Sequence, residues 1–123
     1  MGAWSQAGST RMTVLLSALA QVGVPYRRNT SSPDVSFDCS GFTMYAWSQV
    51  GVDLAHQDRA QIGASAPRNW DTASAGDLVD YPGHVMMFVG AGHAIVHAPN
   101  TGSVVTVREL TGGRSVRLGS PIG

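Results

Sequence analysis

The stretch Ser36-Phe37-Asp38-Cys39-Ser40-Gly41-Phe42 sets the plan of this 123-residue chain, and Cys39 is its only cysteine. Apolar residues recur after it at three- and four-residue steps until Gly51, so the sequence predicts an amphipathic helix over Cys39–Val50. Asp38 stands where an N-cap residue belongs. Cys39 is therefore expected in the first turn of that helix.

The expected position of Cys39 has a chemical consequence. Unpaired backbone N–H groups and the positive end of the helix dipole favour a thiolate, which is the nucleophilic form of cysteine. Gly41 is expected to leave room for a substrate backbone. The alternative is that a lone cysteine is a small buried hydrophobic residue. The neighbours of Cys39 are Asp, Ser and Gly, which favours the nucleophile.

Length and composition predict a single domain and narrow the classes of partner. The chain has eight Arg, no Lys and eight acidic residues, which gives a formal net charge of zero. It contains no basic run, so we expect no nucleic-acid partner. One cysteine cannot form an internal disulfide. We expect a flexible N-terminus over residues 1–9, one domain over residues 10–123, and a monomer.

The apolar run Thr13–Ala20 has two interpretations. It has the features of a signal-peptide core with an Ala-rich cleavage site, but it also forms one face of an amphipathic helix that Gly23 closes. We favour a helix from about Thr10 to Val22. Its expected apolar stripe consists of Met12, Leu15, Leu16 and Leu19. No stretch approaches the roughly twenty apolar residues of a membrane span; if the protein is exported, we expect the signal to lie outside these residues.

Strand patterns dominate the second half of the chain. A short helix is possible over 57–64, and a loop is expected over 67–75. The expected strands cover 77–81, 84–89, 94–98, 104–110 and, as a possible fifth, 114–118. Helices followed by hairpin-linked strands are typical of α+β proteins. We therefore expect N-terminal helices packed on a five- to six-stranded antiparallel sheet.

Two of the four histidines are expected to meet at one edge of this sheet. His84 opens one strand and His97 closes the next, so a hairpin at Gly90–Gly92 would make them neighbours. A cysteine nucleophile needs a base, and the base needs a partner that orients it. The sequence thus predicts a catalytic group of Cys39, His84 and His97.

The other two histidines and a metal site are the competing interpretations. His93 is expected to be exposed in the hairpin turn, and His56 to lie in a loop, with lining of the site as its lesser possibility. A cysteine with two histidines could also bind zinc. The spacing of Cys39, His84 and His97 lacks any close ligand pair such as C-x-x-C. We expect no metal and no cofactor.

Four motifs together resemble the NlpC-type cysteine peptidases of bacterial cell walls. They are Phe37-Asp38-Cys39-Ser40-Gly41-Phe42, Gly76-Asp77-Leu78-Val79, Gly83-His84-Val85-Met86-Met87-Phe88-Val89-Gly90 and Val96-His97-Ala98-Pro99. The resemblance extends from about Met12 to Leu110. It implies a papain-like α+β fold and a secreted or wall-associated enzyme. Such enzymes hydrolyse peptidoglycan stem peptides through a thioester, most often between D-isoglutamate and diaminopimelate.

The resemblance also implies roles for individual residues. It makes Cys39 the nucleophile, His84 the base and His97 the third polar residue. Tyr26 matches a tyrosine near the oxyanion. The groove residues that match are Asp38 and Ser40, and Gln61 matches the family as well.

The chain departs from the family at two places on the groove. Leu54-Ala55-His56-Gln57 replaces a segment that usually reads L-P-R-S, and Arg27-Arg28-Asn29 replaces W-G-G after the tyrosine. Both departures concern the substrate rather than the reaction. Arg27 and Arg28 suit a substrate that carries carboxylates, so we expect cleavage of stems whose carboxylates are free.

Two other functions remain open from the sequence. The same Cys/His site could belong to an amidase or acyltransferase with a substrate other than peptidoglycan, such as a toxin effector. A catalytically silent wall-binding module is disfavoured, because all three reactive positions hold competent residues.

Overall fold

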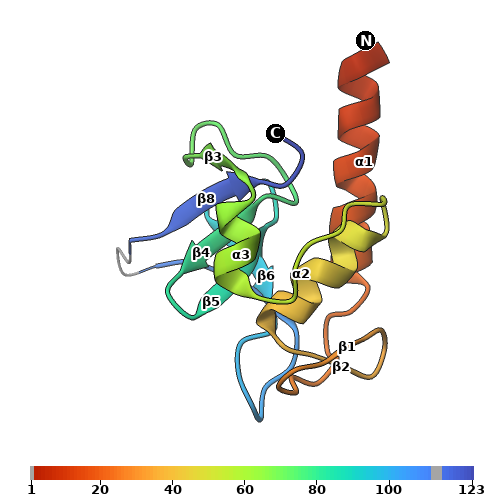
Figure 1. Ribbon diagram of the computed structural model, residues 1–123, viewed down its shortest axis with the longest axis vertical. Coiled ribbons are helices and arrows are strands. Elements are labelled where there is room, and N and C mark those ends of the chain that lie inside the picture. Colours follow the sequence, from red (N-terminus) through yellow and green to blue (C-terminus); the bar gives the residue numbers. More distant parts are fainter. Residues whose placement is uncertain (1, 112–114) are drawn as a thin grey trace.

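A layer of helices covers one face of an antiparallel sheet in the computed structural model, which describes residues 2–111 and 115–123 (Figure 1). The helices are α1 (Gly2–Leu19), α2 (Cys39–Ser48) and α3 (Asp58–Gly63). α2 lies between α1 and the sheet, and α3 covers the sheet beside it. The predicted α+β class, with N-terminal helices on a sheet, is confirmed.

The main sheet has six strands in the order β3-β8-β4-β5-β6-β7, and every neighbouring pair is antiparallel. The strands are β3 (Ala66–Arg68), β4 (Leu78–Tyr81), β5 (His84–Phe88), β6 (Ala94–His97), β7 (Thr106–Glu109) and β8 (Arg117–Ser120). A separate pair, β1 (Ser31–Ser32) and β2 (Ser36–Phe37), precedes α2. The all-buried strand β5 lies near the middle of the sheet and carries His84 at its start.

Alternate residues of β5 belong to two different cores. Val85 and Met87 face the helices, where they pack with Phe37, Phe42 and Trp47. Met86 and Phe88 face the other side, which Trp70 and Leu110 partly cover. Both faces of β5 are therefore apolar, which explains its continuous apolar run.

The predicted bounds of the first helix were wrong, and of its predicted apolar stripe only Leu15 and Leu19 face the core. α1 begins at Gly2 rather than Thr10 and ends at Leu19 rather than Val22. The residues it buries are Val14, Leu15 and Ala18, whereas Met12 and Leu16 are 53% and 57% exposed. The contact with α2 is one narrow stripe, so residues on its flanks stay in solvent. No helix in the described ranges is long and apolar enough to cross a membrane.

Other segments differ from the expectation where strands are short. β1 and β2 are not among the strands expected from the sequence, and β3 begins just before the expected loop over 67–75. β8 begins at Arg117, after the expected start at 114, which lies outside the described residues. β7 is an edge strand, and its Val107 is exposed.

Candidate active site

The start of α2 is fixed by the predicted cap. Asp38 has extended backbone angles, and its Oδ1 accepts a hydrogen bond from the Gly41 N–H at 2.7 Å. Cys39 is the first helical residue and is half-buried. The predicted capping role of Asp38 is confirmed, and this role aims its carboxylate at the helix.

The sulfur of Cys39 lies beside the start of β5. Burial raises the pKa of the Cys39 thiol, and the carboxylates of Asp38 and Asp58 raise it further. The backbone N–H groups of Val85 and Ser40 oppose this by hydrogen bonding to the sulfur. The expectation that the helix start would lower this pKa was wrong, because loss of hydration outweighs the helix end.

His84 and His97 meet as the hairpin predicted. His84 Nε2 lies 2.8 Å from His97 Nδ1, and both residues are buried. Burial lowers the pKa of His97 to about 4, and the charges of His84 and Arg108 add to that effect. His97 is therefore neutral at pH 7, and its Nδ1 can accept a hydrogen bond from His84.

The tautomers of the pair follow from this contact. If His84 acts as a base through Nδ1, its proton sits on Nε2 and is donated to Nδ1 of His97. The proton of His97 then sits on its own Nε2. That atom is buried and has no hydrogen-bond partner among the described residues.

Tyr26 is half-buried and packs against the same core as Cys39. Burial raises the pKa of the Tyr26 hydroxyl, and the charges of Cys39 and Asp38 raise it further, while Arg28 opposes them. The Tyr26 hydroxyl therefore lies within the electrostatic field of Cys39, Asp38 and Arg28. The tyrosine named by the resemblance and the candidate nucleophile thus pack against one core.

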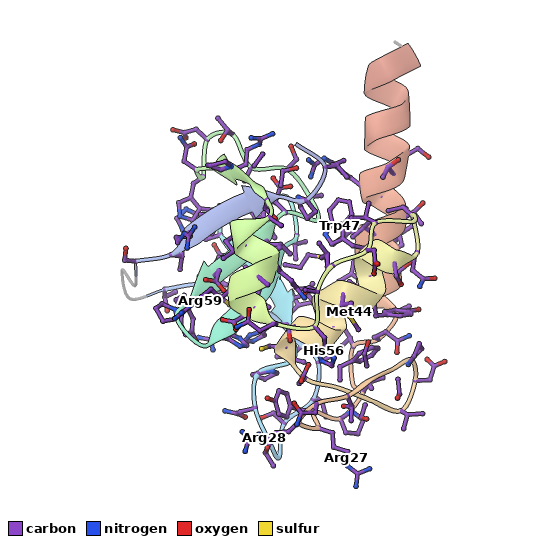
Figure 2. All side chains as sticks on the ribbon, viewed as in Figure 1. Arg27, Arg28, Met44, Trp47, His56 and Arg59 are labelled. Atoms are coloured by element: carbon purple, nitrogen blue, oxygen red, sulfur yellow. The ribbon has the colours of Figure 1, made fainter. Side chains whose placement is uncertain are left out.

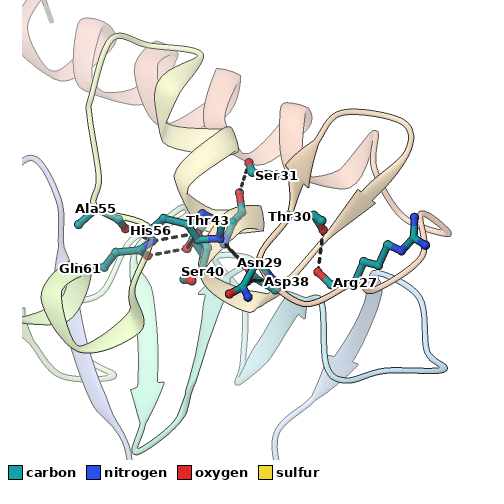
Figure 3. A network of polar contacts seen from close by, with 11 residues as sticks. Arg27, Asn29, Thr30, Ser31, Asp38, Ser40, Thr43, Ala55, His56 and Gln61 are labelled. Atoms are coloured by element: carbon teal, nitrogen blue, oxygen red, sulfur yellow. Dashed lines mark hydrogen bonds and ion pairs between the residues drawn. The ribbon is translucent and has the colours of Figure 1, made fainter.

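The two arginines that follow Tyr26 lie at the surface. Arg27 and Arg28 are both exposed, beyond the start of α2 (Figure 2). Figure 3 shows the Arg27 side chain extending away from the polar network around Asp38. Of the two, Arg28 is the one whose charge acts on Tyr26.

A polar network around Asp38 includes His56, for which lining of the site was only the lesser expectation (Figure 3). His56 Nε2 lies 2.8 Å from Asp38 Oδ1, and the Asn29 N–H donates to Oδ2 at 2.8 Å. His93 is exposed as expected and stacks on Trp70. The His56 contact could not be found from spacing, since nothing in the sequence aligns residue 56 with residue 38.

The small residue at position 41 serves the protein's own backbone. A Cβ at Gly41 would lie 2.1 Å from the Thr30 carbonyl oxygen and 2.7 Å from Asp38 Oδ1. The structure gives a different reason for glycine at this position than the expected room for a substrate. The loop before β1 approaches α2 so closely here that a side chain would not fit.

Gln61 joins the start of α2 to α3. Its Nε2 donates to the carbonyl oxygens of Ser40 and Ala55, both at 2.8 Å, and its Oε1 accepts from Thr43. Ser40 and Gln61 are both buried.

No group of three or more His, Cys, Asp or Glu side chains that could hold a metal ion occurs in the part of the chain that the structure describes.

A helix-start cysteine packed against an antiparallel sheet that carries the paired histidines defines a papain-like fold. The model of the NlpC/P60 family matches residues 23–116, and the chain belongs to this family. The predicted resemblance is confirmed.

Relatives and solved structures agree with this assignment. A probable endopeptidase of Corynebacterium glutamicum is 32% identical over 106 residues, which are 85% of this chain and 50% of the relative. The peptidoglycan endopeptidase RipA of Mycolicibacterium smegmatis is 33% identical over 113 residues, which cover 79% of this chain and 22% of the relative. The structure of the peptidoglycan hydrolase RipB of Mycobacterium tuberculosis aligns with a TM-score of 0.84 at 27% identity, covering 95% of this chain and 67% of that one. The chain spans about half the length, or less, of these curated relatives.

Proposed function

We propose that this domain is a cysteine endopeptidase that hydrolyses peptidoglycan stem peptides. The observation that carries the proposal is the half-buried Cys39 at the start of α2, beside a strand whose His84 contacts His97 at 2.8 Å. The names of the relatives, which include peptidoglycan and DL-endopeptidases, support the same substrate class. Acting on peptidoglycan requires a secreted or wall-associated protein.

The reaction follows from the side chains at hand. His84 takes the proton of the Cys39 thiol at Nδ1, and the sulfur attacks the peptide carbonyl carbon. The oxyanion that forms accepts hydrogen bonds from the Cys39 N–H and the Tyr26 hydroxyl. His84 then gives its proton to the departing amine, which leaves a thioester on Cys39.

The second half of the reaction releases the acyl group. Water loses a proton to His84 and attacks the thioester carbonyl, and the proton returns to the Cys39 sulfur as the carboxylic acid departs. The raised pKa of Cys39 supports a resting thiol, so the base is needed at the moment of attack. His97 accepts from His84 Nε2 throughout and steadies the imidazolium.

The groove residues support a particular bond. Arg28 lies close enough to Tyr26 to act on its hydroxyl, and Arg27 is its exposed neighbour. Two guanidinium groups on this side suit the free carboxylate of a D-isoglutamyl residue. The proposed bond is therefore the one between D-isoglutamate and diaminopimelate, with Asp38 and Ser40 forming the floor of the groove.

Mass spectrometry of defined stem peptides tests this function. The native domain is expected to split L-Ala-γ-D-Glu-diaminopimelate after the glutamyl residue, and Cys39→Ala to lose the cut while keeping its unfolding transition. Cleavage at another bond would refute the bond assignment. If no stem is cut although Cys39 still reacts with an acylating thioester probe, the site belongs to an amidase or acyltransferase with another substrate.

A further inference from the structure

A polar pocket opens at the turn between β4 and β5, next to the start of the strand that carries His84. It has a volume of about 380 Å³, and its walls include Asp58, Arg59, Asp80, Gly83 and Arg117. Two acidic and two basic side chains thus share one cavity. We call it the Asp80 pocket.

Asp80 is the unusual member of this group. It is only 5% exposed, and its buried Oδ1 has no hydrogen-bond partner within the described ranges. Burial raises the pKa of Asp80 to about 6, the carboxylate of Asp58 adds to this, and Arg117 and Arg59 oppose it. In the described part of the chain neither arginine approaches Asp80 closely enough for an ion pair. A buried acceptor without a donor is costly. Because Asp80 also lines the pocket, a cationic group bound there would lie beside this carboxylate and offset part of that cost.

The pocket adjoins the reactive group. Gly83 immediately precedes His84, and the charge of Asp58 acts on the Cys39 thiol. Arg59 lies over the sheet end, whereas Arg27 and Arg28 lie away from it, beyond the start of α2 (Figure 2). A peptide whose acyl part lies along Tyr26 and Arg28 would extend its amine part past Cys39 toward Asp80.

We propose that the Asp80 pocket receives the residue on the amine side of the cleaved bond and selects a side chain that ends in an ammonium beside a carboxylate. The ammonium would donate to Asp80 and Asp58, and the carboxylate would accept from Arg59 and Arg117. This inference rests on the proposed function and assigns the source of its selectivity. Diaminopimelate carries such a zwitterionic end, lysine carries only the ammonium, and alanine carries neither.

Four matched stem peptides separate these contributions. They share L-Ala-γ-D-Glu and end in diaminopimelate, its distal amide, L-Lys or L-Ala, and kcat/KM is measured for each. Asp80→Asn should lower cleavage of the three ammonium-bearing peptides by about tenfold or more and leave the alanine peptide unchanged. Arg117→Gln should reduce the diaminopimelate peptide to the level of its amide and spare lysine. Asp71→Asn, at an exposed loop position, is the matched control.

The dependence on pH gives a second readout. The groups that face Asp80 are Asp58 and Arg59 from α3 and Arg117 from β8. The kcat/KM ratio of the diaminopimelate to the alanine peptide should fall as pH drops through about 6, where Asp80 gains a proton. In Asp80→Asn this ratio should be flat. Because both peptides use the same Cys39 and His84, their titration cancels in the ratio.

The outcomes keep this inference apart from the proposed function. Equal losses on all four peptides would overturn the pocket. So would a kcat/KM ratio of the diaminopimelate to the alanine peptide that is the same in Asp80→Asn and in Arg117→Gln as in the native domain. If the native domain cuts no stem, titration of Cys39→Ala with γ-D-Glu-diaminopimelate decides. Binding that Asp80→Asn removes would retain the pocket although the hydrolase fails, and no binding would reject it.

Discussion

At the scale of single residues, the contact between His84 and His97 joins the proposed base to a neutral acceptor. His97 has a lowered pKa of about 4, so at neutral pH its Nδ1 can hold the proton of His84 Nε2 in place. Losing the base removes proton transfer, whereas losing the acceptor loosens the orientation of the base.

Substitution of the pair should therefore give graded losses. His84→Ala should lower kcat/KM by about 10²–10⁴-fold, the usual contribution of general-base catalysis. His97→Ala should cost less, and His97→Asn or His97→Gln should recover part of that loss, since an amide oxygen can accept from His84 Nε2. Full activity of His97→Ala in the peptide assay would remove His97 from the catalytic group.

Tyr26 offers a test of the oxyanion contact. Its hydroxyl lies within the fields of Cys39 and Asp38, and one oxyanion donor contributes about 2.7–4 kcal/mol to the transition state. Tyr26→Phe should lower kcat with little change in KM. Tyr45→Phe, on a half-buried face of α2, is the matched control. A change confined to KM would reduce Tyr26 to a wall of the groove.

At the scale of elements, the Gly76-Asp77 motif before β4 holds the helices to the sheet. Arg11 of α1 forms an ion pair with Asp77 at 2.6 Å and also donates to Ser120 on β8. Trp47 of α2 donates from its indole Nε1 to the Gly76 carbonyl oxygen at 2.9 Å. Gly76-Asp77, one of the motifs on which the family resemblance rests, thus stabilises the fold rather than taking part in the reaction.

This anchor predicts a stability effect without a direct catalytic one. Asp77 is fully buried, so Asp77→Ala leaves Arg11 without its partner, and breaking such a pair costs about 3–5 kcal/mol. Urea unfolding should show that loss, while kcat/KM measured well below the transition stays near native. The exposed Asp71→Ala should change the unfolding free energy by less than about 0.5 kcal/mol. Equal stabilities of the two variants would contradict the anchor.

The sequence was most informative where one element carries its own signal. β5 is a continuous apolar run between turn residues, and α2 has a cap, a stripe and a stop, so both were predicted. β1 and β2 have two residues each, too few for any period. The Asp80 pocket was missed because α3, β4 and β8 contribute to it from distant parts of the chain. The direction of the Cys39 pKa shift was also missed, because burial raises this pKa and the spacing of residues in the sequence does not reveal burial.

At the scale of the whole molecule, two buried groups titrate in the same pH range with opposite effects on stability. The pKa of His97 falls from 6.5 to about 4 on folding, so below pH 6.5 the unfolded chain binds the proton and stability decreases toward pH 4. The pKa of Asp80 rises from 3.8 to about 6, so the folded chain holds that proton and stability decreases as pH rises through this range.

These opposing slopes predict how single variants respond to pH. Each group contributes up to about 1.4 kcal/mol per pH unit, so between pH 4 and 6 their effects on the native protein largely cancel. Relative to native, Asp80→Asn should gain unfolding free energy as pH rises, and His97→Gln should lose it. Urea unfolding at intervals from pH 4 to 7 measures both differences.

The double variant distinguishes this origin from a general loss of stability. His97 titrates beside His84 and Arg108, and Asp80 beside Asp58, Arg59 and Arg117, so the two groups share no neighbour that shifts their pKa values. Effects of such independent sites usually add. Asp80→Asn with His97→Gln should therefore return the slope of unfolding free energy against pH close to that of the native protein, at a lower absolute value. Parallel curves for all four proteins would show that neither group keeps its shifted pKa in solution.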